Sequence, residues 1–168
     1  MSDADKMHAA CAAMAVKGPQ HDTLGRFAGT WRAEVKLWMD PAAPPQVSQG
    51  TMKCTPVLGG RFLQQEYRDD AGMFEGRGFW GYNTVDERYE GFWIDSMATF
   101  FQLEHGRHDP KTDTYTMTGT MTDPTSRKTI RKRSVIVYKS PNEHTIEMFF
   151  EGQAGRENKG MEIRYTRA

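Results

Sequence analysis

The sequence predicts an all-β protein: a single antiparallel β-barrel of about ten strands with a short helical segment at its N-terminus. After Gly29, short segments that alternate in polarity or are rich in aromatics follow one another at regular spacing, separated by turn-forming residues. Glycines interrupt the most aromatic of these segments, between Met73 and Met97. A glycine inside a strand usually marks a bend or a close backbone approach, and curved strands favour a barrel over a flat sheet.

Length, charge and cysteine usage limit the class of protein further. The 168 residues are expected to form one domain, with a helical segment over residues 1–28 and the barrel over residues 29–168. The 22 basic and 22 acidic residues balance, which gives no reason to expect a nucleic-acid or membrane partner. Cys11 and Cys54 lie far apart, and no signal-peptide or membrane-spanning pattern appears. A reduced, cytoplasmic protein is therefore expected.

Two helices are expected before the barrel. Residues 3–16 are alanine-rich, with Met7 and Met14 at helical spacing, which predicts a weakly amphipathic helix packed on or over one end of the barrel. Asp22 is a candidate N-cap for a second helix over residues 23–28, because its side chain can accept from the first free amide groups.

The strands are predicted from alternation and from the turns between them. The first begins at Thr30, where apolar Trp31 and Ala33 open a period-two pattern, and Pro41 ends it. The others are expected at residues 46–57, 61–69, 74–82, 88–95, 98–105, 114–122, 128–139, 145–151 and 160–167.

Trp93, Asp95 and Met97 lie on one face of their strand if that strand continues through Ser96. In one interpretation this face lines a cavity, and the Asp95 carboxylate fixes a ligand or acts as a base. In the other, which we favour, Asp95 ends the strand and accepts hydrogen bonds from the backbone of the turn that follows.

Glu66, Arg131, Arg133 and Glu147 form a second candidate set, each inside a predicted strand. If they point inward, they pair across the barrel or hold a carboxylate. Residues 127–133 are almost entirely basic, however, and charged residues are seldom buried unless paired. We therefore favour a solvated position for this set.

Two motifs carry a resemblance to known proteins. Gly29-Thr30-Trp31, at the start of the first strand, resembles the opening of the calycins, the lipocalins and fatty-acid-binding proteins. The series Trp38-Met39-Asp40-Pro41, Leu58-Gly59-Gly60-Arg61-Phe62, Gly81-Tyr82-Asn83 and Trp93-Ile94-Asp95-Ser96-Met97 is similar to the DUF1579 family, a bacterial group of unassigned function. The resemblance implies a lipocalin-like barrel and no particular activity. It also implies that Trp31 closes one end and packs against a basic residue of the last strand, Arg164 or Arg167.

The leading functional hypothesis is a small-molecule binding protein whose barrel holds an apolar ligand with a polar head. The expected lining residues are Tyr67, Trp93, Met97 and Phe101, with Glu66, Asp95, Arg133 and Glu147 as candidate polar anchors. The calycin resemblance supports the interior arginine, since fatty-acid-binding barrels hold their ligands in this way.

Other functions stay open at this point. An isomerase or cyclase is one, with Asp95 or Glu66 as general acid or base. A barrel filled by its own side chains and serving as an interaction scaffold is another. Exposed Trp38 or Trp80 would mark a homodimer surface. His105 and His108 form only a pair of possible ligands, so no metal is predicted, and the sequence carries no cofactor motif.

Overall fold

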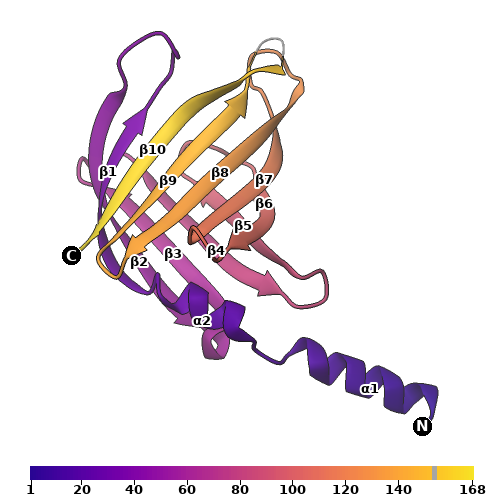
Figure 1. Cartoon of the computed structure of the whole chain (residues 1–168). Coiled ribbons are helices and arrows are strands. Elements are labelled where there is room, and N and C mark those ends of the chain that lie inside the picture. Colours follow the sequence, from indigo (N-terminus) through magenta and orange to yellow (C-terminus); the bar gives the residue numbers. More distant parts are fainter. Residues whose placement is uncertain (153–154) are drawn as a thin grey trace.

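The polypeptide closes on itself through the pairing of its first and last strands. In the computed structural model, which describes residues 1–152 and 155–168, ten antiparallel strands follow one another around a closed barrel in sequence order (Figure 1). The strands are β1 (Gly29–Leu37), β2 (Gln46–Val57), β3 (Phe62–Asp69), β4 (Glu75–Asn83), β5 (Arg88–Asp95), β6 (Gln102–Asp109), β7 (Thr114–Thr122), β8 (Thr129–Ser140), β9 (Glu143–Glu151) and β10 (Glu157–Arg167). The predicted fold class is confirmed.

All ten predicted strands are present, and the largest difference in bounds is at β6, which covers Gln102–Asp109 rather than residues 98–105. Asp95 ends β5 and accepts a hydrogen bond from the Met97 amide (3.0 Å), so the residues that follow form a turn. β9 and β10 begin earlier than expected, at Glu143 and Glu157. The turn predicted over residues 152–159 contains 153 and 154, which lie outside the described residues.

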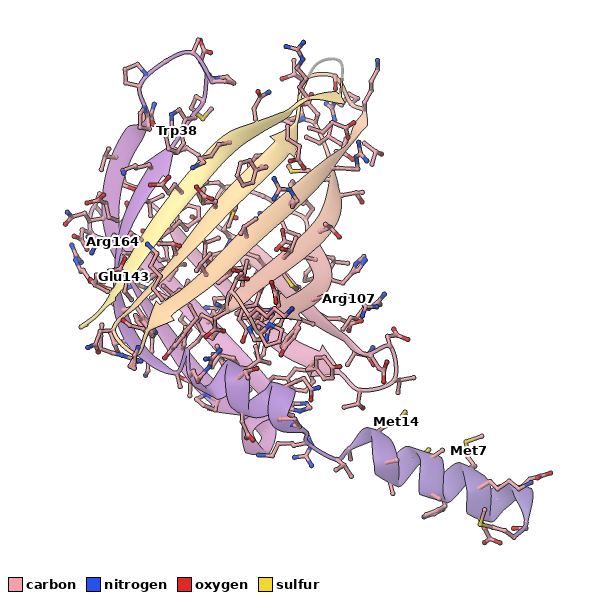
Figure 2. The ribbon with its side chains drawn as sticks, viewed as in Figure 1. Met7, Met14, Trp38, Arg107, Glu143 and Arg164 are labelled. Carbon is pink, nitrogen blue, oxygen red and sulfur yellow. The ribbon has the colours of Figure 1, made fainter. Side chains whose placement is uncertain are left out.

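The two helices differ from the prediction. α1 (Asp3–Met14) has no buried residue and extends away from the barrel, with Met7 and Met14 exposed (Figure 2). It therefore does not pack over an end of the barrel, because its few apolar side chains form too weak a face. α2 (Pro19–Gly25) covers that end instead; it begins after Gly18, so Asp22 lies inside the helix and is not its N-cap.

Aromatic side chains fill the end of the barrel that α2 covers, which we call the closed end. Phe27 contacts Trp80, Tyr115 and His144 at ring-centroid distances of 5.1 to 5.7 Å. Trp80 is buried, so it is not a dimer surface, and Trp38 is half-buried beside Lys159. Cys54 is a buried free thiol in the same cluster, and Cys11 is an exposed free thiol on α1.

Trp31 and Arg167 join the two strands that close the barrel. Trp31 is fully buried and its indole N–H donates to the Phe27 carbonyl (2.8 Å). The Arg167 guanidinium lies 3.8 Å from the centroid of the Trp31 ring and donates to the carbonyls of Ala28 and Pro141. Arg164 faces outward and pairs with Glu143 (Figure 2). Arg167 is thus the basic partner of Trp31.

His144 is an unusual member of this apolar cluster. Its ring stacks on Tyr165 and meets Trp31 edge-on, and its Nδ1 atom is buried without a hydrogen-bond partner among the described residues. Burial lowers the pKa of His144 to about 3, with a smaller contribution from the positive charge of Arg167. The imidazole is therefore neutral in the folded protein at all ordinary pH values.

We expect His144 to make the protein sensitive to mild acid. As pH falls below 6.5, the unfolded chain binds a proton at His144 that the folded protein does not bind, so stability falls by about 1.4 kcal/mol per pH unit. Carboxylates add their own loss only below about pH 4.5. Urea unfolding at pH 7.0 and 5.0 measures the effect.

His144→Phe removes the titrating group and should abolish most of this loss between pH 7.0 and 5.0. Because the Nδ1 atom has no partner, the substitution should cost little stability at pH 7.0. His8→Ala, on exposed α1, is the control and should retain the full loss. Equal pH dependence of His144→Phe and the unmodified protein would contradict the assignment.

Candidate functional site in the open half of the barrel

The half of the barrel away from α2, which we call the open half, has a different interior. Inward-facing side chains at the closed end are buried, whereas those near the other rim are partly exposed. The apolar members of this rim are Val35 and Leu37 on β1, Met121 on β7, Ile130 on β8, Met148 and Phe150 on β9, and Met161 on β10. The inward-facing side chains of the open half are therefore less completely buried than those of the closed half.

Trp93 lies flat against the inner wall of the open half. It pairs in register with Gly78 on β4, and a Cβ atom at Gly76 or Gly78 would collide with its indole. The indole N–H donates to Asp95 (3.1 Å), which fixes the orientation of the ring. The two glycines therefore allow the Trp93 ring to lie along the inner wall instead of across the lumen.

A connected set of polar side chains crosses the interior beside Trp93. Asp95 accepts from Gln102 (3.1 Å), and the Gln102 carbonyl oxygen accepts from the Lys132 ammonium (3.2 Å). Lys132 also lies 3.2 Å from Glu104, which accepts from the Ser134 hydroxyl (2.7 Å). We call these five residues, Asp95, Gln102, Glu104, Lys132 and Ser134, the polar array.

Lys132 is the most strongly buried charge of the array, with 6% of its surface exposed. Burying an ammonium group is costly unless it is paired and hydrogen-bonded. A lysine has three donors, and the described residues offer Lys132 two acceptors, Gln102 and Glu104. The third donor of the ammonium has no acceptor among the described residues.

The structure places three of the predicted lining residues on the inner wall. Trp93 and Asp95 belong to the site described above, and Asp95 also makes the turn hydrogen bond that the favoured interpretation required. Tyr67 is buried and points inward next to Phe74. Its hydroxyl occupies the space that a side chain at position 50 would need; Gly50 lies on β2, two residues from Met52, the register partner of Tyr67.

The prediction that Met97 and Phe101 line the interior is wrong. Because β5 ends at Asp95, Met97 lies in the following turn and is 76% exposed rather than on the face of Trp93. Phe101 precedes β6, is 69% exposed and touches the outward-facing Phe92. Neither side chain lines the interior.

The second candidate set, Glu66, Arg131, Arg133 and Glu147, lies on the outer wall, as the favoured interpretation held. The alternative prediction, that these residues anchor a ligand inside the barrel, is therefore wrong. Glu66 pairs with Arg77, Arg133 with Glu157 (2.7 Å), and Glu147 with Lys159. Arg131 is exposed and reaches Glu151. These pairs neutralise neighbouring strands and leave the interior to the polar array. Acid–base catalysis by Asp95 stays a prediction; for Glu66 the outward position removes it from the lumen.

Sequence reasoning missed Lys132, Gln102 and Glu104. Lys132 stands within the basic run at residues 127–133, and the composition of the run concealed its alternation. Ile130, Lys132 and Ser134 share the inward face of β8, a period-two signal present in the sequence. Gln102 and Glu104 required the correct start of β6.

Metal binding finds no support in the part of the chain that the structure describes. Within residues 1–152 and 155–168, no three His, Cys, Asp or Glu side chains are grouped as a metal site would require. None of the helices described is long and apolar enough to span a membrane.

The closed barrel, with its aromatic end and a polar inner wall, defines a lipocalin-like β-barrel protein. A family model described as "Protein of unknown function (DUF1579)" matches residues 16–167, and the chain belongs to this family. No curated protein matches the chain.

Three solved structures are similar to the chain. An S-type phycobiliprotein lyase from Guillardia theta is 12% identical, with a TM-score of 0.55, over 89% of this chain and 92% of the other. A de novo designed fluorescence-activating β-barrel is 15% identical, with a TM-score of 0.47, over 88% and 98%. A redesigned β-barrel is 14% identical, with a TM-score of 0.39, over 87% and 95%. At these identities the likeness concerns the fold alone.

We expect Gly76→Ala to dislodge Trp93. The added methyl group would overlap the indole, so the ring must leave the wall and lose its hydrogen bond to Asp95, at a cost of about 1–3 kcal/mol for overpacking. Urea unfolding measures the loss, and the indole N–H resonance of Trp93 reports the displacement. Gly25→Ala is the control, because a Cβ there meets nothing within 4 Å. An unchanged Trp93 resonance in Gly76→Ala would contradict this account.

Proposed function

We propose that the protein binds a small amphipathic molecule in the open half of the barrel. The observation that carries the proposal is the buried Lys132 ammonium, which points into the lumen below a partly exposed apolar rim. The polar head of the ligand meets the polar array, and its apolar part lies along the rim. Sites of this composition, mostly apolar with a few convergent polar groups, are typical of small-molecule binding.

The charges of the array favour a neutral head group. Lys132 contributes one positive charge, while Asp95 and Glu104 contribute two carboxylates, both already hydrogen-bonded. An added carboxylate or phosphate would be repelled by these neighbours in a poorly hydrated space. A ketone, ester or amide oxygen instead accepts the spare Lys132 donor without adding charge.

Trp93 adds shape selectivity to this proposal. One face of its indole lies against the glycine backbone of β4, and the hydrogen bond to Asp95 holds the plane of the ring in place. The opposite face is available to a flat or extended apolar group. Tyr67 stands on the same inner wall and belongs to the proposed lining.

The test compares 2-octanone, 1-octanol and octanoate as probes of equal chain length. Binding is followed by tryptophan fluorescence and by amide chemical shifts. We expect 2-octanone to bind about tenfold more tightly than octanoate, the difference that one unfavourable charge contact of about 1.4 kcal/mol produces. Shifts should concentrate on β5, β6 and β8. Equal or tighter binding of octanoate would contradict the proposed neutral head group.

Lys132→Met should weaken binding of 2-octanone about tenfold, because the ketone oxygen loses its donor. The substitution leaves Glu104 without its cation, so it is combined with Glu104→Gln, which keeps an acceptor for Ser134. Lys139→Met, an exposed position on the same strand, is the control and should bind within twofold of the unmodified protein. Unchanged affinity in the double variant would refute the role of Lys132.

A further inference from the structure

A second cavity, of about 350 Å³, lies at the closed end beside α2. It is lined by Pro19, Gln20 and Thr23 of α2 and, from the barrel, by Tyr82, Glu87, Tyr89, Arg107, His108 and Pro110. The buried aromatic cluster around Phe27, Trp80 and Tyr115 separates it from the polar array in the open half. This cavity has its own polar chemistry and does not rest on the proposed function.

His108 presents a hydrogen-bond acceptor whose role is fixed by its neighbours. Asp113 accepts from Arg26 through both carboxylate oxygens (2.8 and 2.7 Å), and this bond holds the pKa of Asp113 below its usual range. An ionised carboxylate can only accept, so His108 Nε2, 2.8 Å from Asp113, must be the donor. In the neutral imidazole Nδ1 is then the acceptor.

The Nδ1 atom of His108 is free to bind a ligand. No described residue hydrogen-bonds to it, and it is not among the described polar atoms that are buried without a partner, so it is not fully buried. His108 lines the cavity. The ring itself is held in place, since it stacks on Tyr115 at 4.1 Å and keeps only 14% of its side-chain surface exposed. A fixed ring with one free lone pair is a preorganised acceptor.

Tyr89 adds a second acceptor to the same wall. The Thr23 hydroxyl donates to the Gln20 carbonyl (2.7 Å), so in its 3.0 Å contact with Tyr89 it must accept, and Tyr89 must donate. The Tyr89 proton is therefore already used, and its oxygen offers the cavity a lone pair. Burial raises the pKa of Tyr89 to about 12, so the hydroxyl stays protonated and keeps this arrangement.

The rest of the wall combines aromatic and proline side chains with three polar ones, the half-buried Gln20 and the exposed Glu87 and Arg107. Tyr82 and Tyr89 meet edge-on at 4.9 Å, and two prolines lie on the α2 and β6–β7 sides. The Tyr82 hydroxyl can serve as donor or acceptor, and Glu87 and Arg107 are exposed to solvent. His108 and Tyr89 are the more buried polar groups of the wall, so we base the expected ligand chemistry on them. Aromatic faces with two acceptors fit an aromatic ring that carries an O–H or N–H donor.

We propose that this cavity is a binding site for a small aromatic hydrogen-bond donor, a phenol or an N–H heteroaromatic, whose donor points at His108 Nδ1. A volume of about 350 Å³ accommodates a substituted single ring. The ring lies among Tyr82, Tyr89 and the two prolines.

The experiment measures binding of phenol and of anisole, the methyl ether that lacks the donor, by amide chemical-shift titration of the full chain. We expect phenol to shift the amides of Thr23, Tyr89 and His108 and to bind about tenfold more tightly than anisole, the weight of one hydrogen bond. This comparison uses only the unmodified protein. Equal affinities, or shifts confined to the open half, would overturn the proposal.

Variants then test the acceptor itself. His108→Phe keeps a ring to stack on Tyr115 but removes Nδ1, and should lower phenol affinity about tenfold while leaving anisole within twofold. His105→Phe, an exposed position on the same strand, should leave both unchanged. Phenol binding that persists in a folded His108→Phe would overturn the proposal. The Lys132→Met variant should retain phenol binding, which separates this site from the one in the open half.

Discussion

The contact between Arg167 and Trp31 is the constraint on which the barrel depends. A ten-strand sheet closes only if its first and last strands pair, and this contact lies at the end of that seam. Arg167 also donates to carbonyls before β1 and in the β8–β9 turn, so one guanidinium connects three segments far apart in the sequence. Gly29 makes room for it: a side chain there would collide with the guanidinium, and its φ of 122° suits glycine.

This closure divides the interior into two chemically different halves. At the closed end, large rings pack around Phe27. The neutral His144 is tolerated there because Tyr165 stacks on its ring and Phe27 and Trp31 meet it at right angles. In the open half, glycines on β4 replace side chains, and Trp93 lies along the wall instead of across it. Large rings are thus packed together at one end, and at the other a single indole covers the glycines of the wall. The distribution of glycine and aromatics along β4 and β5 sets where each half begins.

The local sequence pattern predicts most of the fold. It succeeds for strands and turns, because these depend mainly on residues that are neighbours in the sequence. The alternation around Trp31, the turn residues and the glycines identified the barrel and its strands. The outward orientation of Glu66 and Arg133 was also predicted correctly, since charged residues are seldom buried unless paired. Met97 and Phe101 were misplaced because a side chain–backbone hydrogen bond at Asp95 ends β5, and one such bond changes which residues share a face. The partners of Lys132 and of His108 come from other strands or turns, and no local pattern identifies them.

The position of Lys132 follows from the pairing of its neighbours. Arg131 and Arg133 flank it on β8 and pair outside the barrel with Glu151 and Glu157. A shift of one residue would bury both arginines and expose Lys132, so the outer ion pairs help to hold the register that keeps the lysine inside. Exposed pairs of this kind contribute little to stability individually, about 0–1 kcal/mol. Their effect on register is larger than their effect on stability, because an alternative register would bury two guanidinium groups among apolar side chains. An apolar residue at position 132 would avoid the cost of burying a charge, so the folded state bears the desolvation of Lys132, which Gln102 and Glu104 offset in part.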